Sequence, residues 1–220
     1  MLVNITLILG LVSWLRGREE GREEKLFAAW SIINDGQGDQ SGVVKTAVER
    51  LHKDGFSLLD LQLNETDLSG ANLSEANLLR ANLSGAYLSA NLSGAYLEEA
   101  NLSKANLLAA NLSGANLLAA NLSGANLLAA NLSGAIFMQA NLSGTNFRGA
   151  YLFNAIKLSN AQIKLACYWK EAIYVNATRV EDESGGIYWI PEDKQANQER
   201  IKEIEQDKDS DPEIPPDCSK

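Results

Sequence analysis

The sequence predicts a solenoid, a chain wound in regular coils around one axis, and three observations support this. One phrase, Ala-Asn-Leu-Ser-Gly or a near variant, recurs from Asp67 to Leu152. Successive copies are five residues apart, with a single four-residue step. A period of five fits neither the 3.6 residues of a helical turn nor the alternation of a flat strand. Because each short unit can bury its apolar side only against its neighbours, the repeat predicts stacked coils.

Two positions in every five are apolar. A large residue marks the centre of each unit, and a small residue, nearly always Ala, stands two positions before it. We expect both to point inward and the other three positions to face solvent. The centres are residues 58, 63, 68, 73, 78, 83 and 88, then 92 and every fifth residue to 152, all Leu except Phe137 and Phe147.

The segment Ala71-Asn72-Leu73-Ser74-Glu75 and its successors resemble the pentapeptide repeat family, whose pattern is Ala-(Asp/Asn)-Leu followed by two variable residues. The resemblance implies an all-β solenoid, a right-handed quadrilateral parallel β-helix with one pentapeptide per side. Taking four sides from the family, the pentads make about five coils, roughly 24 Å long at about 4.8 Å per coil.

The chain divides into five parts. We expect an apolar N-terminal segment over 1–18, a helical cap over 19–55 and the β-helix over 56–160. An irregular C-terminal lid with a helix follows over 161–206, and a disordered tail over 207–220.

The N-terminal segment contains an apolar run, Leu2 to Leu15, followed by several basic residues. As a helix the run would span about 21 Å, short of the roughly 30 Å hydrocarbon core. It lacks the basic start and the cleavage site of a signal peptide. Three interpretations stay open: the end of a membrane anchor, a helix in the membrane interface, or a helix packed on the cap. Basic residues after an anchor would keep the following domain cytoplasmic.

Helices are expected over Glu19–Asn34 and Ser41–Asp54, the second with an apolar stripe. An open solenoid end exposes unpaired strand edges, so some cover is required. The run Ala29–Leu51 resembles the segment before the repeats in membrane-linked bacterial, particularly cyanobacterial, members of the family. We therefore predict an N-terminal helical cap.

The repeat becomes irregular after Leu152. A six-residue step would put Lys157 inward unless Leu158 takes its place. A helix is expected over Gln195–Gln206, and the Pro-rich, acidic residues 207–220 predict disorder. Aromatic residues absent from the repeats favour a terminal lid; they are Tyr168, Trp169, Tyr174, Tyr188 and Trp189.

Charge weighs against one function known in this family. Some members mimic DNA and protect DNA gyrase, which requires ordered acid along the coils because the partner's basic groove is built for phosphates. The net charge is -9, but residues 56–160 hold only six acidic and four basic side chains. The family's frequent Asp before the centre is almost always Asn here. A DNA-mimic protector of a topoisomerase is therefore the disfavoured alternative, and without a basic stripe we expect no nucleic-acid binding.

No residue pattern indicates catalysis, a cofactor or a metal. The sequence shows no nucleophile with a base, no ligand spacing and no phosphate loop, and His52 is the only histidine. Cys167 and Cys218 lie in different regions, which implies no disulfide framework and makes a reduced compartment the default. We expect a non-enzymatic, cytoplasmic protein without cofactor or metal.

The asparagines before the centres have two interpretations. In Asn-Leu-Ser triplets they could be ligands or glycosylation acceptors. The favoured interpretation is that their amides stack from coil to coil, bonding neighbouring amides or turn backbone.

Residues just after the centres predict a contact surface. On four sides they form outward columns, and solvent gives no reason for repeated outward leucines, whereas contiguous apolar patches mark contacts. The alternative is a ten-residue copy spread by duplication without function. One column holds Leu59, Leu79, Glu98, Leu118 and Met138, and the opposite one holds Ser69, Ser89, Leu108, Leu128 and Arg148. The candidate interface is Leu79, Leu108, Leu118, Leu128 and Met138.

The four-residue step lies at Ser89-Ala90. One missing residue would turn every later Leu outward unless the register is restored locally. We predict that Leu88 and Leu92 both stay buried and that the corner between them tightens at the expense of a ladder hydrogen bond.

The sequence thus favours a non-enzymatic scaffold or protein–protein interaction module. Its partner would be another protein or a second copy of the chain. Contact with a membrane through Leu2 to Leu15 is a further expectation.

Overall fold

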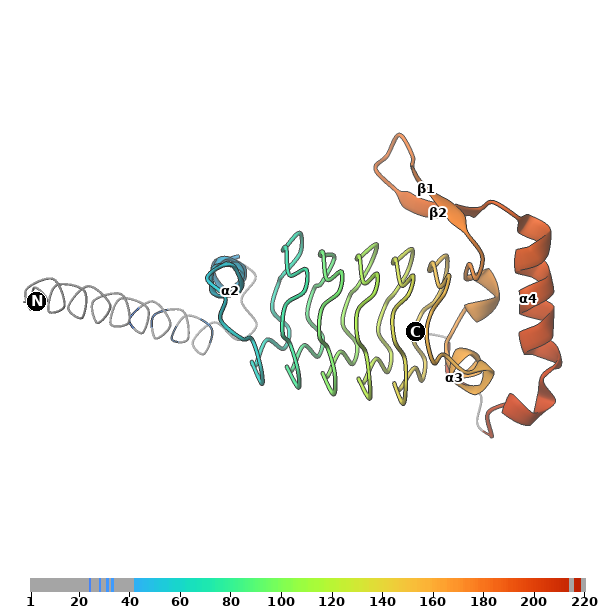
Figure 1. The fold of residues 1–220 in the computed structure, drawn as a ribbon, viewed down its shortest axis with the longest axis horizontal. Coiled ribbons are helices and arrows are strands. Elements are labelled where there is room, and N and C mark those ends of the chain that lie inside the picture. Colours follow the sequence, from blue (N-terminus) through green and yellow to red (C-terminus); the bar gives the residue numbers. More distant parts are fainter. Residues whose placement is uncertain are drawn as a thin grey trace, which may run out of the picture.

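The computed structural model describes Glu24, Ala28, Ser31, Ile33, residues 42–213 and residues 216–218. Helix α2 (Val43–Lys53) precedes a row of stacked coils, and the remaining elements follow the coils (Figure 1). These are α3 (Asn160–Leu165), the 3₁₀ turn η1 (Trp169–Glu171), β1 (Ala177–Glu181), β2 (Ile187–Pro191), α4 (Lys194–Gln206) and the 3₁₀ turn η2 (Lys208–Ser210).

Each coil has four sides. Away from the four-residue step and the irregular end, parallel bridges join residues 20 apart, as in Asn101↔Asn121 and Asn121↔Asn141, and 20 residues are four pentapeptides. The expected four-sided β-helix is therefore confirmed by the register. The centres stack in interior columns and are fully buried; one such column is Leu63, Leu83, Leu102, Leu122 and Leu142. At about 1.5–3 kcal/mol per buried Leu, these columns provide the core.

Each corner is a tight turn. The Ala71 N–H donates to the Leu68 carbonyl at 3.0 Å, and the residue before it, Gly70, has φ 73°. A positive φ at the third position of a four-residue turn is the type II geometry, which favours Gly. Ala119 takes the same place with φ 53°, so the coils use this turn even where the repeat lacks Gly.

The register is restored at the short step as predicted. Leu88 and Leu92 are both fully buried. The Ala90 N–H donates to the carbonyl of Leu88, two residues back, at 2.7 Å. The missing residue is the one with positive φ, whose N–H would donate to the Leu108 carbonyl. Among the described residues no backbone N–H reaches that carbonyl, so one ladder bond is lost.

Inserting Gly after Ser89 should be neutral or should stabilise the protein by up to about 1 kcal/mol. The new residue can adopt positive φ without steric cost, and its N–H can bond the Leu108 carbonyl. Denaturant unfolding measures the effect. As a control, Gly inserted after Ser113, where the corner is already complete, should destabilise. A clear loss of stability for the first insertion would contradict the assignment of the missing residue.

Helix α2 packs on the first coils. Its apolar side, Val44, Ala47, Val48 and Leu51, lies in the same buried cluster as the centres, together with Ile33. Lys45 Nζ donates to the Ser69 carbonyl at 3.1 Å, and the Glu49 carboxylate accepts from the Asn72 N–H at 2.9 Å. The helix therefore both covers the core and pairs backbone groups at the exposed edge of the coils.

Much of the N-terminal prediction lies outside the described residues. That is true of Leu2–Leu15 and of most of the helix expected over Glu19–Asn34, in which the four described residues are helical. Within the described part of the chain, no helix has both the length and the apolar character needed to cross a membrane. Membrane attachment stays a prediction.

The ladder continues beyond the regular repeats. Asn146 bridges Cys167, and Tyr151 bridges Ile173, so segments after α3 add a partial coil. Lys157 is exposed with φ 55°, while Leu158 packs against the core. Leu158 therefore takes the inward place and Lys157 stays outside. This is the alternative that the sequence offered for the six-residue step.

The hairpin β1–β2 was missed by the sequence analysis. Its strands pair antiparallel, with Arg179 opposite Trp189. Trp189 stacks on Tyr151 at 4.5 Å and its Nε1 donates to the Ala129 carbonyl at 3.0 Å. Figure 1 shows the hairpin standing beside the last coils. Alternating β-formers on both sides of the Gly-Gly pair at 185–186 were the available signal.

Two predictions about the C-terminus are wrong. Cys167 and Cys218, 51 residues apart, form a disulfide, contrary to the default of reduced thiols. The described part of 207–220 holds specific contacts rather than being disordered. Lys164, only 5% exposed, donates to the Asp207 carbonyl and to Asp211 Oδ1, and this hydrogen bond lowers the pKa of Asp211. Nothing in the sequence indicated that Cys167 lies on the β-helix ladder, opposite Asn146, where the tail can reach it.

Candidate protein-interaction face

Amide ladders run along two faces of the solenoid, and a shorter ladder joins Asn106, Asn126 and Asn146 on another. On the face centred on Leu122, Asn121 Nδ2 donates to Asn101 Oδ1 at 3.3 Å, and the Asn121 Oδ1 accepts from the Ser123 N–H at 3.1 Å. The face centred on Leu112 repeats this arrangement, with Asn131 Nδ2 donating to Asn111 Oδ1 at 3.2 Å. This confirms the stacking predicted for the asparagines. Because the amides already bond one another, these faces offer a partner few free groups.

The fourth face breaks the pattern. We call it face A: the side centred on Leu78, Leu97, Leu117 and Phe137. Its column after the centres is the predicted Leu79, Glu98, Leu118 and Met138. In the column before the centres, Tyr96, Ile136 and Ile156 replace Asn and interrupt the amide ladder. Tyr96 is 52% exposed, Ile156 47% and Met138 43%.

Four apolar side chains of face A lie on adjacent coils, whereas Asn116 separates the fifth, Tyr96, from Ile136 in its column. Ile136 bridges Ile156 on the next coil, and the Ala119 N–H donates to the Met138 carbonyl at 2.8 Å, which sets Leu118 beside Met138. Ile136 and Met138 flank the buried Phe137, about 7 Å apart along the strand. We call the residues Tyr96, Leu118, Ile136, Met138 and Ile156 the apolar patch.

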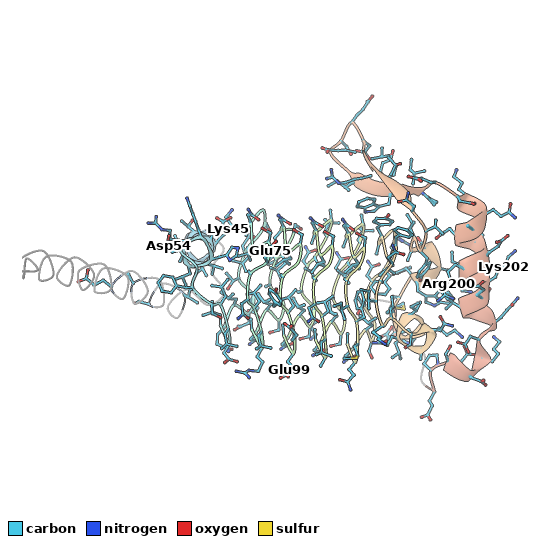
Figure 2. The ribbon with its side chains drawn as sticks, viewed as in Figure 1. Lys45, Asp54, Glu75, Glu99, Arg200 and Lys202 are labelled. Atoms are coloured by element: carbon cyan, nitrogen blue, oxygen red, sulfur yellow. A yellow bond between two sulfur atoms is a disulfide. The ribbon has the colours of Figure 1, made fainter. Side chains whose placement is uncertain are left out.

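Charges of opposite sign bound the apolar patch. On its N-terminal side are Glu98, which accepts from Asn116 Nδ2 at 2.6 Å, and the exposed Glu99, at the lower edge of the solenoid in Figure 2. On its C-terminal side is the exposed Lys157. Farther towards the N-terminus, Arg80 pairs with Asp60 at 2.7 Å, and this bond lowers the pKa of Asp60. Glu99 also interacts electrostatically with Arg80, so one acidic side chain is in excess at the N-terminal end of face A, and Lys157 lies at the other end.

The structure does not bring the five predicted interface residues into one site. Leu79, Leu118 and Met138 lie on face A, whereas Leu108 and Leu128 lie on the opposite face. Leu108 is 40% exposed, but at its C-terminal end the opposite face meets the protein's own lid. There Arg148 forms an ion pair with Glu171 at 2.9 Å and lies 4.4 Å over the Tyr168 ring, and Trp189 bonds the Ala129 carbonyl.

Sequence reasoning missed half of face A. It identified the column after the centres but not Tyr96, Ile136 and Ile156 in the column before them. The signal was present, because a large apolar residue at a position that the repeat reserves for Asn faces solvent in this register.

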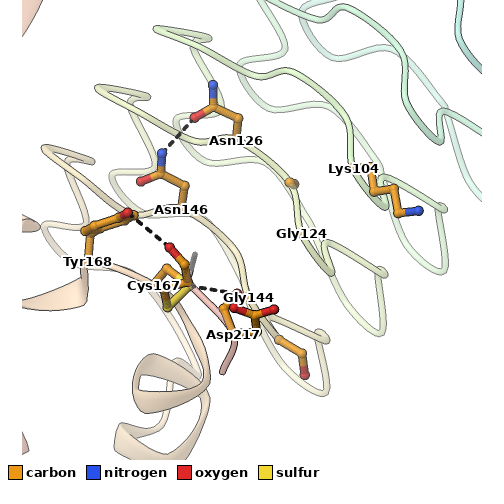
Figure 3. Close-up of a pocket in the computed structure, with 11 residues that line it drawn as sticks. Lys104, Gly124, Asn126, Gly144, Asn146, Cys167, Tyr168 and Asp217 are labelled. Carbon is orange, nitrogen blue, oxygen red and sulfur yellow. Dashed lines mark hydrogen bonds between the residues drawn. A yellow bond between two sulfur atoms is a disulfide. The ribbon is translucent and has the colours of Figure 1, made fainter. Parts of the chain in front are cut away.

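A groove of about 670 Å³ lies beside the disulfide (Figure 3). Coil corners line one side, where Asn146 Nδ2 donates to Asn126 Oδ1 at 3.1 Å. The tail lines the other, held by the disulfide and by the Tyr168 hydroxyl, which donates to the Cys218 carbonyl at 3.3 Å. The groove brings no nucleophile and base together. No group of His, Cys, Asp and Glu in the described part of the chain could hold a metal ion.

Comparison with known proteins identifies the family. The model for pentapeptide repeats matches residues 61–89, 90–127 and 119–156, with eight copies. Rfr23, a pentapeptide repeat protein from the cyanobacterium Cyanothece 51142, is 30% identical, with 58% of this chain and 96% of that chain covered, and a TM-score of 0.33. The chain belongs to the pentapeptide repeat family. Membership of this family implies that the quadrilateral β-helix is right-handed.

Two other solved pentapeptide repeat proteins are similar over part of their length. HetL of Nostoc, involved in heterocyst differentiation regulation, is 34% identical, with 55% of this chain and 60% of that chain covered and a TM-score of 0.20. A protein of the Arabidopsis thaliana thylakoid lumen is 30% identical, with 40% and 60% covered and a TM-score of 0.28. This chain thus spans 60% of the length of each. No curated protein matches it.

Proposed function

We propose that this pentapeptide repeat protein is a non-enzymatic scaffold or protein–protein interaction module whose contact surface is face A. The observation that supports this is the apolar patch, a group of large, partly or largely exposed side chains on a solenoid whose other faces carry amide ladders. Such patches on soluble proteins mark contact sites. The rigid core beneath it holds the patch flat and fixed in shape.

The two ends of the solenoid have a different role in this proposal. We assign to α2 the function of an N-terminal cap and to α3, η1 and α4 that of a C-terminal lid. Gln162 of α3 donates to the carbonyls of Phe137 and Ala140 at 2.8 and 3.0 Å, and Asn197 of α4 donates to the Ala172 carbonyl at 3.3 Å. These elements hydrogen-bond to the exposed edge of the last coils and cover it. The side faces of the solenoid are then the surface that a partner can reach.

A photo-cross-linking amino acid in place of Leu118 tests the proposal, with the same probe at Ser123 as the matched control. The two positions lie on the same coil but on neighbouring faces, so they sample the same concentration of any partner. On irradiation in the source cell we expect a protein adduct at position 118 and little or none at 123. Equal adducts at the two positions, or none at 118, would contradict face A as the contact surface.

A further inference from the structure

We propose that face A binds face A of a second copy of this chain, with the two solenoids antiparallel. The inference deepens the proposed function, because it rests on face A being a contact surface and names the partner. The two-fold axis lies in the interface, parallel to the strands, midway between the coil of Leu118 and the coil of Met138.

This symmetry determines which side chains meet. A two-fold axis parallel to the strands reverses the order of the coils but leaves each outward column facing its own counterpart. Leu118 then meets the partner's Met138, and each occurs twice in the interface. One coil farther from the axis, Tyr96 meets the partner's Ile156. These two are the most exposed apolar side chains of face A, and the arrangement covers both.

The charges of face A are complementary in the same arrangement. Glu98 and Glu99 lie one and a half coils to one side of the axis, and Lys157 follows the Ile156 position one and a half coils to the other, about 7 Å from the axis in each direction. Each Lys157 therefore meets the acidic pair of the other copy. A parallel arrangement would set acid against acid and base against base. Complementary rim charges of this kind select register and orientation more than they add affinity.

Self-complementarity is what favours a second copy over an unrelated protein. An unrelated partner requires only an apolar patch, and it places no constraint on the signs of the charges at the two ends of that patch. A two-fold interface requires that each end of the patch complement the other end. Face A meets this requirement in its charges and where Leu118 meets the partner's Met138 and Tyr96 meets the partner's Ile156, while Ile136 lies opposite the partner's Asn116.

Charge reversal combined with mixing tests the arrangement, with sedimentation equilibrium of the full chain as the measurement. The wild type should form dimers. The variants K157E and E98K/E99K each set like charges together, and each should weaken self-association at least tenfold. An equimolar mixture of the two variants restores both opposed pairs and should form a heterodimer. K104E, the same charge change on the face centred on Leu122, should leave dimerisation at the wild-type level.

Three outcomes would overturn the antiparallel pair: a wild-type chain that stays monomeric, charge variants that dimerise like the wild type, or a mixture that fails to associate. The cross-link at position 118 separates this failure from failure of the proposed function. An adduct to a different protein would keep face A as a contact surface while rejecting the second copy. Whether the partner is a second copy or a different protein, the variant L118S/M138S should prevent association through face A without changing secondary structure.

Discussion

Replacing Leu122 with Ala should destabilise the protein by about 2 to 5 kcal/mol. Leu122 is fully buried, with Leu102 and Leu142 stacked before and after it in one interior column. Removing its side chain leaves a cavity that the backbone cannot close, because ladder bonds hold the coils on both sides; the Leu122 N–H, for example, donates to the Asn141 carbonyl at 2.9 Å. Denaturant unfolding measures the loss.

Leu118→Ala is the matched control. It removes the same atoms four residues away in the same coil, but from an outward side chain. At concentrations where the chain is monomeric it should cost less than about 1 kcal/mol, as surface substitutions do. Equal losses for the two variants would mean that the inward and outward positions of the repeat are not distinct, and face A would then lose its basis.

Removing the disulfide should have the second large effect. Cys167 and Cys218 close a loop that contains η1, the hairpin β1–β2, α4 and η2. By the loop-entropy relation, a cross-link over 51 residues stabilises by about 4 kcal/mol. The double variant C167S/C218S should therefore lose the C-terminal elements first on heating. Trp189, which stacks on Tyr151, reports this step by its fluorescence.

Reductant provides the control for the disulfide. Dithiothreitol should lower the melting temperature of the wild type to that of C167S/C218S and should leave the double variant unchanged. An unchanged wild type would show that the bond does not stabilise the fold. Alkylation of thiols in rapidly acidified source cells tests the compartment, since a protein held in the reducing cytosol would be modified at both cysteines. The cytoplasmic location expected from sequence stays a prediction until then.

The sequence predicted the coils and a C-terminal lid, but not the hairpin or the disulfide within that lid. A strict five-residue period fixes which side chains share a column, so the burial of Leu88 and Leu92 across the short step could be derived from register alone. The number of sides per coil had to be taken from the family resemblance, because a period of five residues is compatible with coils of different numbers of sides. That Leu158 rather than Lys157 packs inward could be predicted from the free-energy cost of burying an unpaired charge.

What could not be derived depended on contacts between distant segments. Nothing near Cys218 in sequence indicates that the tail returns to the last coil, because Lys164, Asp207 and Asp211 meet only after folding. For a similar reason the sequence predicted only one of the two outward columns of face A, the one after the centres. The repeat template drew attention to recurring residues, whereas Tyr96, Ile136 and Ile156 are exceptions to it.

The amide ladders make this protein an electrically polar rod. In the ladder bonds of the asparagines the Nδ2 always belongs to the later coil and the Oδ1 to the earlier one, as in the bonds from Asn91 to Asn72 and from Asn111 to Asn91. The side-chain dipoles therefore add along the axis, with the positive end towards α2, where the Glu49 carboxylate bonds the Asn72 N–H. Two such rods lying antiparallel would cancel each other's field.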